Sequence, residues 1–384
     1  MIPFYKPDVS FADAAAVVES LGTGWITRGD KCRNLENALV SKYGAKGAFV
    51  SDSNTACMEL ALRYLGIRKG DEVITTPYTY SATADIIYNI GAKIVFCDLR
   101  EGSYEMDYDK LAELINENTK AVIPVDIGGV PCNYGRIFEV VNYKKNVFMP
   151  STKEQEMLGR IAVISDSAHS INCAGSGTNA DFTAFSFHAV KNVTCGEGGA
   201  LLWTISDADA YRRIGLLADH GQTGKTDIYK YDIELFGQNH IMTDYAAAIA
   251  LSQLRRVDEI TTKRRSLTMK YKKFIRQDCE VLYSEGSACH LLMVRLPNEC
   301  NRDDVARFMN SNGIGVNVHY IPLPMFTAYK NIGFDIKDYP KAYKEFTREI
   351  TLPLYNGLDM SSIREVCGVL DEAVRSGMYE RSFF

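Results

Sequence analysis

Seven short apolar runs alternate with longer amphipathic segments along the first 204 residues of the chain. The runs are rich in β-branched residues and cover residues 47–51, 72–76, 93–97, 120–125, 161–165, 182–187 and 199–204. Residues 55–65, 81–90 and 107–115 repeat apolar side chains at the spacing of a helix. Strands that alternate with helices are typical of a mostly parallel sheet flanked by helices. The pattern therefore predicts a large α/β domain.

The pattern changes near residue 244. Residues 244–274 predict one long helix, whose basic side chains we interpret as a solvated face. A strand over 289–296 and helices over 302–312 and 361–374 follow. We therefore expect a large domain over residues 1–244 and a smaller α+β domain over residues 245–384. Within the large domain, the polar stretch 134–160 predicts a helix followed by a long loop.

Composition and charge narrow the class of protein. The chain has 384 residues, of which 46% are hydrophobic and 24% charged, as in an ordinary globular protein. Its 43 basic and 48 acidic residues give a net charge of -5 without a long run of either sign, so no nucleic-acid surface is expected. No apolar run approaches the ~20 residues that span a bilayer, and the N-terminal segment lacks the layout of a signal peptide. We expect no membrane partner.

Cysteine and histidine spacing bears on metals and on the cell compartment. The ten cysteines are scattered, without a Cys-x-x-Cys pair or a Cys/His cluster at zinc-ligand spacing. The simplest interpretation is a cytoplasmic protein with reduced thiols and no metal site.

Lys191 stands out in the segment 181–199, where an apolar strand ends at Phe187 and a loop of small residues and glycines follows. The carboxyl end of a buried strand is where α/β proteins place their ligands. Partial desolvation there lowers the pKa of an amine, which an amine nucleophile needs in order to form a Schiff base. Taken alone, the motif is also compatible with an ordinary exposed loop lysine.

Another apolar strand, residues 161–165, ends directly before Asp166. A carboxylate at this strand end points into the same crevice as Lys191, where it would keep a pyridine nitrogen protonated so that the ring acts as an electron sink. A helix cap is the alternative for Asp166. His169, three residues on, either donates to a ring oxygen or satisfies a core carbonyl.

Two further strand ends supply polar and aromatic residues. Residues 50–57 turn from strand to helix, and the free amides there, with the Thr55 hydroxyl, would bind an anion. An ordinary N-cap by Ser53 or Asn54 is the alternative. Residues 75–83 place tyrosines directly after a strand, where one could stack on a flat ring or belong to the core. Together, a phosphate site, a stacking ring, a ring-nitrogen partner and an amine are the parts of a pyridoxal 5'-phosphate (PLP) site.

The chain resembles a known family in these same motifs. Residues 24–29, 186–199, 319–323 and 352–354 are similar to segments of the DegT/DnrJ/EryC1/StrS aminotransferases, most specifically Ser186-Phe-His-Ala-Val-Lys-Asn-Val-Thr-Cys-Gly-Glu-Gly-Gly199. The resemblance covers nearly the whole chain. It implies the fold type I architecture of PLP-dependent transferases, which has a mostly parallel sheet in the large domain and a smaller α+β C-terminal domain.

The resemblance also implies roles for individual residues. Lys191 is the expected catalytic Schiff-base lysine, and Asp166 is the expected partner of the pyridine nitrogen. The other implied cofactor contacts are His169 near the ring hydroxyl, Tyr80 as the stacking aromatic, and Ser186, Asn54 and Thr55 at the phosphate. Asn239 is expected to reach the phosphate of the neighbouring subunit, so that a homodimer would share its active sites. We expect His188, His319 and Tyr320, which lie in the matching motifs, to contact the substrate.

Several positions depart from the family pattern. Asn54 stands where glycine is usual, so we expect the turn to use the tolerance of asparagine for positive φ. Ile241 replaces a common arginine, Pro324 a histidine and Asp126 a frequent histidine, and the connection over residues 146–159 is longer than usual. The cofactor set stays complete, whereas the identity of the sugar is left open.

The expected activity is the transfer of an amino group to a 3-keto or 4-keto sugar carried on a nucleotide, for glycan or surface polysaccharide biosynthesis. The resemblance implies L-glutamate as the donor. A PLP-dependent sugar dehydratase of the same superfamily is one alternative, but such enzymes typically carry histidine in place of the lysine. An inactive regulatory homologue is another, and it should have lost Lys191 or Asp166. A dinucleotide enzyme or a metal hydrolase is disfavoured because no Gly-x-Gly-x-x-Gly follows the first strand and no histidine-rich ligand pattern exists.

Overall fold

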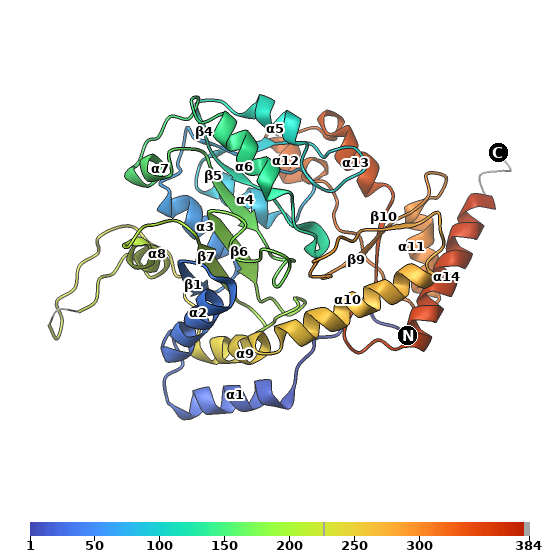
Figure 1. The fold of residues 1–384 in the computed structure, drawn as a ribbon, viewed down its shortest axis with the longest axis horizontal. Coiled ribbons are helices and arrows are strands. Elements are labelled where there is room, and N and C mark those ends of the chain that lie inside the picture. Colours follow the sequence, from blue (N-terminus) through green and yellow to red (C-terminus); the bar gives the residue numbers. More distant parts are fainter. Residues whose placement is uncertain (226, 380–384) are drawn as a thin grey trace.

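The structure is a computed structural model, and it describes residues 1–225 and 227–379. The runs predicted as strands form one seven-stranded sheet in the order β1-β7-β6-β5-β4-β2-β3 (Figure 1). Its strands are β1 (Gly47–Ser51), β2 (Glu72–Thr75), β3 (Lys93–Phe96), β4 (Thr119–Ile123), β5 (Ala162–Asp166), β6 (Phe182–Ser186) and β7 (Gly199–Trp203).

All strands of this sheet except β7 run in the same direction. Parallel pairing joins β3, β2, β4, β5 and β6, whereas β7 pairs antiparallel with both β6 and β1. The connection from β6 to β7, residues 187–198, is described throughout and contains no helix, which suits an antiparallel pair. The carboxyl ends of β1, β2, β5 and β6 therefore share one edge of the sheet with the start of β7. The prediction of a mostly parallel sheet is confirmed.

Helices cover both faces of the sheet because its strands are apolar on both sides. One face packs against α3, α4 and α8, and the opposite face packs against α5 and α6 at one end and against α2 and α9 at the other. Helix α1 lies outside α9 (Figure 1). These helices are α1 (Phe11–Gly22), α2 (Asp30–Tyr43), α3 (Asn54–Tyr64), α4 (Ala82–Asn89), α5 (Tyr108–Leu114), α6 (Tyr134–Tyr143), α8 (Ala210–Ala218) and α9 (Asp244–Leu254).

A short helix was not expected in the polar stretch 134–160. After α6 the chain forms α7 (Lys153–Leu158), where only a loop was predicted. Thr152 caps this helix, since its hydroxyl accepts a hydrogen bond from Gln155 N at 3.3 Å. Gln155 is buried and donates to the Leu65 carbonyl at 2.9 Å, which ties the helix to the end of α3.

The C-terminal part of the chain builds a three-stranded antiparallel sheet in the order β10-β9-β8. This sheet and its helices enclose a second apolar core, to which Ile2 also contributes. The boundary between residues 244 and 245 stays a prediction, because the side chains of α9 join the core under α2. The elements are α10 (Val257–Phe274), β8 (Glu280–Val281), β9 (Leu292–Arg295), α11 (Arg302–Ser311), α12 (Thr327–Asn331), α13 (Pro340–Phe346), β10 (Glu349–Leu352) and α14 (Met360–Tyr379).

The prediction of one solvated helix over residues 244–274 is wrong in two respects. The segment is broken between α9 and α10, where Arg256 leaves helical geometry and its guanidinium lies 3.0 Å from the buried Asp13 carboxylate. Arg264 is buried rather than solvated, and donates to the carbonyls of Cys289, His290 and Leu354 at 2.6 to 3.0 Å. These carbonyls belong to the loops next to β9 and β10, so Arg264 joins α10 to the small sheet.

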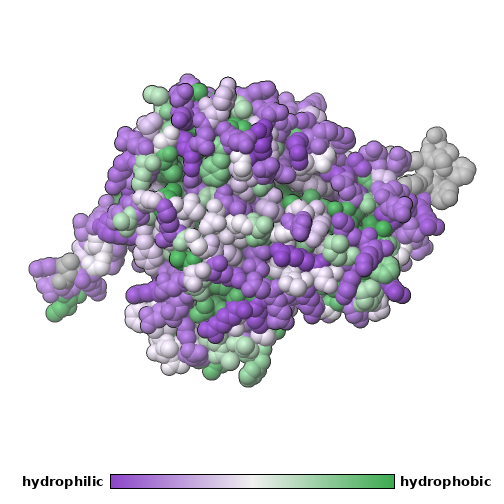
Figure 2. All heavy atoms as spheres, viewed as in Figure 1, coloured by the Kyte–Doolittle hydropathy of each residue, from purple (hydrophilic) through white to green (hydrophobic). Residues whose placement is uncertain are grey.

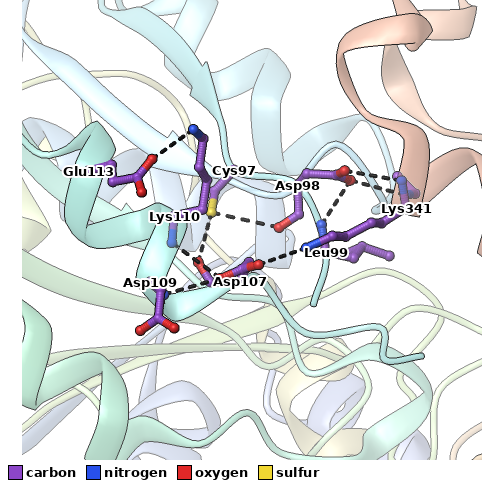
Figure 3. Close-up of polar contacts among 9 residues, drawn as sticks. Cys97, Asp98, Leu99, Asp107, Asp109, Lys110, Glu113 and Lys341 are labelled. Atoms are coloured by element: carbon purple, nitrogen blue, oxygen red, sulfur yellow. Dashed lines mark hydrogen bonds and ion pairs between the residues drawn. The ribbon is translucent and has the colours of Figure 1, made fainter. Parts of the chain in front are cut away.

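The loop after β3 joins the large domain to α13 (Figure 3). The Asp98 carboxylate accepts hydrogen bonds from the backbone N–H groups of Lys341 and Ala342 at 3.1 and 3.0 Å, and so caps the start of α13. The Lys341 ammonium reaches Asp107 at 2.8 Å. A carboxylate at a helix start and an ion pair beside it together hold the two parts of the chain against each other.

Three further observations concern membranes, metals and thiols. No helix within residues 1–225 and 227–379 combines the length and the apolar character needed to cross a bilayer. In the same residues, no three histidine, cysteine, aspartate or glutamate side chains gather as metal ligands would. All ten cysteines are buried, and no disulfide joins them in the part of the chain that the structure describes.

Candidate active site

The residues singled out at four strand ends meet at one edge of the large sheet. Asp166 ends β5, Ser186 ends β6, and Lys191 follows β6 by a few residues. In the sheet, Asp166 pairs with Ala184, and Ser186 pairs with Gly199 at the start of β7. The register of three neighbouring strands thus brings the predicted set together.

Asp166 is almost fully buried and accepts hydrogen bonds on both carboxylate oxygens. The Thr83 hydroxyl donates to Asp166 Oδ2 at 2.7 Å, and Ala168 N donates to Oδ1 at 3.2 Å. Burial raises the pKa of Asp166, while the hydrogen bonds and the charge of Lys191 act in the opposite direction. A buried carboxyl that lacks a full set of donors suits a cationic N–H group as its partner.

Lys191 is held by its backbone and has a perturbed amine. Its N–H donates to the His188 carbonyl at 2.9 Å, and the Tyr5 hydroxyl contacts the carbonyls of Ala189 and Lys191 at 3.0 and 3.4 Å. Burial lowers the pKa of Lys191 to about 8, and the Asp166 carboxylate opposes this shift. The alternative of an ordinary exposed loop lysine does not fit this environment.

His169 lies in a defined tautomer beside the two charged residues. Gly128 N donates to His169 Nδ1 at 3.2 Å, so the proton of a neutral ring belongs on Nε2, which lies 3.1 Å from the Tyr320 hydroxyl. Burial, followed by the Lys191 charge, lowers the pKa of His169 well below its ordinary value. The ring is therefore neutral, and its second nitrogen is a donor.

The start of α3 lies directly against the sheet edge. A Cβ atom at Gly199 would come within 2.4 Å of the Ser53 carbonyl carbon and 2.5 Å of Asn54 N, so only glycine permits this approach. Ser53 is the N-cap, and its hydroxyl accepts from Ala56 N at 3.1 Å. The first N–H groups of a helix lack partners within the helix, so an anion site at this turn, with Thr55 and Ser186, stays a prediction.

Asn54 differs from its expected conformation. It is the first residue of α3 and lies outside the set of non-glycine residues with positive φ, so the expectation of a left-handed turn is wrong. Its side-chain amide instead donates to the Ala184 carbonyl at 2.7 Å. This bond ties α3 to β6.

Tyr80 and Asn239 lie at the exposed rim. Tyr80 is 63% exposed, and its ring centroid is 6.1 Å from that of Tyr320, whereas Tyr78 of the same motif is fully buried in the core. The exposed tyrosine is thus the one available for stacking. Asn239 is exposed and pairs through its backbone with Asp219, and none of its described contacts joins it to the Lys191 group.

The three predicted substrate contacts surround the same site. His188 Nε2 lies 3.6 Å from a Glu197 carboxylate oxygen at the surface. His319 is partly buried, and its Nδ1 lies 2.8 Å from the Thr351 hydroxyl. Tyr320 links this side to the cofactor side through its hydrogen bond to His169.

Comparisons with known proteins decide the family. The profile of the DegT/DnrJ/EryC1/StrS aminotransferase family matches residues 8–371. The chain belongs to this family. A similar protein is the spore coat polysaccharide biosynthesis protein SpsC of Bacillus subtilis, which is 30% identical, with 97% of each chain covered. The UDP-4-amino-4-deoxy-L-arabinose–oxoglutarate aminotransferase of Shewanella sediminis is also 30% identical, over 97% of this chain and 98% of its own.

A solved structure gives the same result for the fold and the cofactor. A protein of Streptococcus pneumoniae, assigned as a sugar aminotransferase, is 38% identical over 99% of both chains with a TM-score of 0.96 in its PMP form. Its PLP form superposes with a TM-score of 0.94. The predictions of the family, of the fold type I architecture, of an aminotransferase and of PLP as its cofactor are confirmed.

The described residues of this family member fit the cofactor. The close approach that Gly199 permits sets the start of α3, with its backbone N–H groups, against the sheet edge, which suits a phosphate. The buried Asp166 offers a carboxylate to a ring nitrogen, and the lowered pKa of Lys191 suits an amine that must react in its neutral form. The chemical character of these groups thus fits PLP.

Three residues of the site were not predicted. Thr83 binds Asp166, but its motif was considered for aromatic stacking alone. His290 packs against His169 with ring centroids 4.6 Å apart, and its Nδ1 is 3.1 Å from Asn192 Oδ1. Asn192 in turn donates to the Ala288 carbonyl at 2.9 Å, which anchors the residue next to Lys191. In the sequence, the one signal for the contact of His290 with His169 is that this histidine stands directly before an apolar run.

Asp126, where the family often has histidine, supports the loop that carries His169. It is buried and accepts hydrogen bonds from the hydroxyls of Ser170 and Tyr134 at 2.6 and 2.9 Å and from Cys132 N at 2.9 Å. Burial raises the pKa of Asp126 to about 6. The residue lies behind the site and organises its backbone.

Proposed function

We propose that this protein transfers an amino group from L-glutamate to a keto-sugar carried on a nucleotide, with PLP held at Lys191. The observation that carries the proposal is the placement of Lys191 and Asp166 at one sheet edge, close enough that each shifts the pKa of the other. The sugar substrate is suggested by similar proteins, one of which is an aminotransferase of a UDP-linked sugar.

The cofactor contacts follow from the geometry of the site. Asp166 would pair with the pyridine nitrogen, and the first turn of α3 with Thr55 and Ser186 would hold the phosphate. His169 would lie against the ring and donate from Nε2, and Tyr80 would cover the exposed face. When bound, PLP supplies an electron sink for the electron pair left after the Cα–H bond of the donor breaks.

Lys191 would move the proton that this bond breakage releases. Its amine has a pKa of about 8, so it can both accept and return a proton near neutral pH. The Asp166 carboxylate would keep the nitrogen of the bound ring protonated. Both groups are present, which favours aminotransfer over the dehydratase and over an inactive homologue.

A homodimer with shared sites is part of the proposal. The arm, defined as residues 220–225 and 227–236, extends from the body between α8 and α9 (Figure 1). Its Ile228 and Phe236 are 88% and 97% exposed, and α1 exposes Phe11 at 89%. Figure 2 shows hydrophobic residues on the arm and at the lower edge where α1 lies. Apolar groups of this size are normally covered by a partner, and a second copy would let Asn239 reach its neighbour.

We further propose that the protein works in the cytoplasm. The ten buried cysteines would stay reduced in that compartment.

Direct incubation tests the reaction. The purified protein is incubated with PLP, L-glutamate and a panel of 3-keto and 4-keto nucleotide sugars, and mass spectrometry measures the exchange of the keto oxygen for an amine. Lys191→Ala is the matched control and should give no amine product. Loss of a sugar hydroxyl without amine gain would instead establish the dehydratase.

Mixed dimers test whether active sites are shared. Subunits with Lys191→Ala are combined with subunits carrying Asn239→Ala. If each site takes Lys191 from one chain and Asn239 from the other, the mixed dimer keeps one intact site and half of the wild-type activity. Activity no higher than that of the two separate variants would contradict sharing.

A further inference from the structure

Strand β10 presents two buried polar side chains. Along Glu349–Leu352, Ile350 and Leu352 belong to the core of the small domain. Side chains alternate across a strand, so Glu349 and Thr351 face the other way. Both are 0% exposed. A carboxyl and a hydroxyl that are kept out of water need hydrogen-bond partners.

The partners come from the segment that carries His319. Asn317 pairs with Thr351 in an antiparallel bridge, which places His319 opposite Glu349. His319 N donates to Glu349 Oε2 at 2.8 Å. The His319 ring reaches back along the strand, and its Nδ1 lies 2.8 Å from Thr351 Oγ1. Thr351 Oγ1 in turn lies 2.5 Å from Glu349 Oε1.

The Thr351 hydroxyl has one proton and two neighbours that can accept it. If it donates to Glu349, its oxygen must accept a proton from His319 Nδ1, and the other ring nitrogen, Nε2, is left as an acceptor. If it donates to His319 Nδ1, its oxygen must accept from a protonated Glu349, and Nε2 carries the ring proton. The protonation of Glu349 thus determines the tautomer of a neutral His319.

The two titrating groups are in the states that this coupling requires. Burial lowers the pKa of His319 to about 3, and the charge of Lys191 acts in the same direction, so the imidazole is neutral. Burial raises the pKa of Glu349 to about 8, against the opposing effects of Thr351, His319 N–H and Arg302. Glu349 is therefore mostly protonated at neutral pH and ionises as the pH rises through about 8.

Among the charged and titratable groups near His319 and Glu349, two titrate near pH 8, namely Glu349 itself and Lys191. Three tyrosines next to Glu349 have raised pKa values because they are buried, and stay protonated. Lys191, which acts on His319, has a pKa of about 8 and must be controlled for. The groups around Glu349 are Tyr78, Tyr104, Tyr320, Arg302 and the Arg295–Glu345 ion pair, and those around His319 are Lys191, His169 and His290.

We propose that Glu349 is a positioning residue that sets, through Thr351, whether His319 Nε2 offers a donor or an acceptor to the substrate. With Glu349 protonated, Nε2–H is a donor that suits an anionic oxygen. The diphosphate of the sugar nucleotide and the carboxylate of the amino donor both supply such an oxygen. With Glu349 ionised, the Nε2 lone pair faces that oxygen and repels it. The identity of the ligand rests on the proposed function, whereas the tautomer does not.

Nitrogen NMR measures the tautomer directly. The full-length protein is labelled with ¹⁵N-histidine, and the signals of His319 among the six histidines are assigned with the His319→Gln variant. We expect a protonated Nε2 well below pH 8 and a protonated Nδ1 well above it. Because no turnover is needed, this result stands or falls independently of the aminotransferase activity. A His319 tautomer that is the same on both sides of this pH would overturn the proposal.

Three variants separate the coupling from other effects. Glu349→Gln keeps an oxygen for His319 N and an amide donor for Thr351, so it should hold Nε2–H at every pH. Thr351→Val should abolish the dependence on pH, whereas Thr268→Val, which removes another buried hydroxyl that has no partner among the described residues, should retain it. Lys191→Ala removes the other group that titrates near 8 and should also retain it. A loss of the dependence in Lys191→Ala would assign the effect to the lysine and refute the role of Glu349.

Kinetics then identify which oxygen His319 meets. KM is measured for glutamate and for the sugar nucleotide in the wild type and in Glu349→Gln, below and above pH 8. In the wild type, KM for the substrate that His319 binds should rise about tenfold at high pH, as expected for the loss of one hydrogen bond to a charged group. In Glu349→Gln that rise should be absent. An equal rise in both proteins would refute the link between tautomer and binding.

Discussion

Thr83 allows a direct test of how the Asp166 carboxylate is kept ionised. Its hydroxyl is fully buried, donates to Asp166 Oδ2 at 2.7 Å and lies 3.0 Å from the Thr79 hydroxyl. Thr83→Val keeps the shape and removes the donor. Burial already raises the pKa of Asp166, and without this donor the pKa should rise further. A smaller share of the carboxyl groups is then available to pair with a cationic ring nitrogen.

The size of the effect follows from the bond that is lost. A hydrogen bond to a charged group contributes about 1.5 to 3 kcal/mol, and about 1.4 kcal/mol is a factor of ten in affinity. We therefore expect PLP affinity to fall by about ten- to a hundredfold in Thr83→Val, with a parallel fall in kcat/KM. Spectrophotometric titration of the cofactor-free protein measures the affinity, and circular dichroism checks the fold.

Thr79 provides the matched control. Thr79→Val removes a buried hydroxyl that contacts Thr83 and not Asp166, so its loss in PLP affinity should be clearly smaller. Equal losses in the two variants, or wild-type affinity in Thr83→Val, would show that this donor does not act on the charge of Asp166.

Three other changes test the site and the core. The rate at which PLP joins the cofactor-free protein should rise with pH up to about 8 and then level, because only the neutral Lys191 amine reacts. Asp166→Asn removes the carboxylate that raises the pKa of Lys191, so stopped-flow absorbance should show the rate levelling at a lower pH. Gly199→Ala, whose Cβ would come within 2.4 Å of the Ser53 backbone, should weaken the binding of inorganic phosphate and PLP. Gly368→Ala, where a Cβ meets nothing within 4 Å, should not. Equal affinities of the two variants in calorimetry would refute a phosphate site at the start of α3. Arg264→Lys cannot reach three carbonyls and should lower the free energy of unfolding by about 2 to 4 kcal/mol in urea titrations, against no more than ~0.5 for the exposed Arg255→Lys.

The large sheet and its edge could be predicted because their signals are local. Apolar runs define the strands, and parallel strands bring their carboxyl ends together, so Lys191 and Asp166 could be placed from the order of the elements alone. The break at Arg256 could not, since it depends on an ion pair with Asp13, which lies far away in the sequence. Similarly, the contacts of His290 and Thr83 with the site depend on the packing of distant segments, and no spacing rule encodes them.

Strand β10 could not be predicted for a different reason. The short strand Glu349–Leu352 alternates polar and apolar residues, but four residues are too few for their pattern alone to predict a strand. Its polar residues then proved to be the partners of His319. A strand whose polar side faces another part of the chain, rather than water, looks like an ordinary surface strand until the fold is known.

The path of the first five residues affects how the enzyme can be immobilised or fused. Ile2 forms two backbone hydrogen bonds with Gly313 and Gly315, and its side chain enters the small-domain core, while the Tyr5 hydroxyl reaches the loop of Lys191. A bulky affinity tag or a bead linker attached at Met1 would disturb both the small-domain core and the loop of Lys191. Attachment through an engineered cysteine on the outer face of a helix distant from this strap, such as α5 (Figure 1), should leave cofactor loading undisturbed.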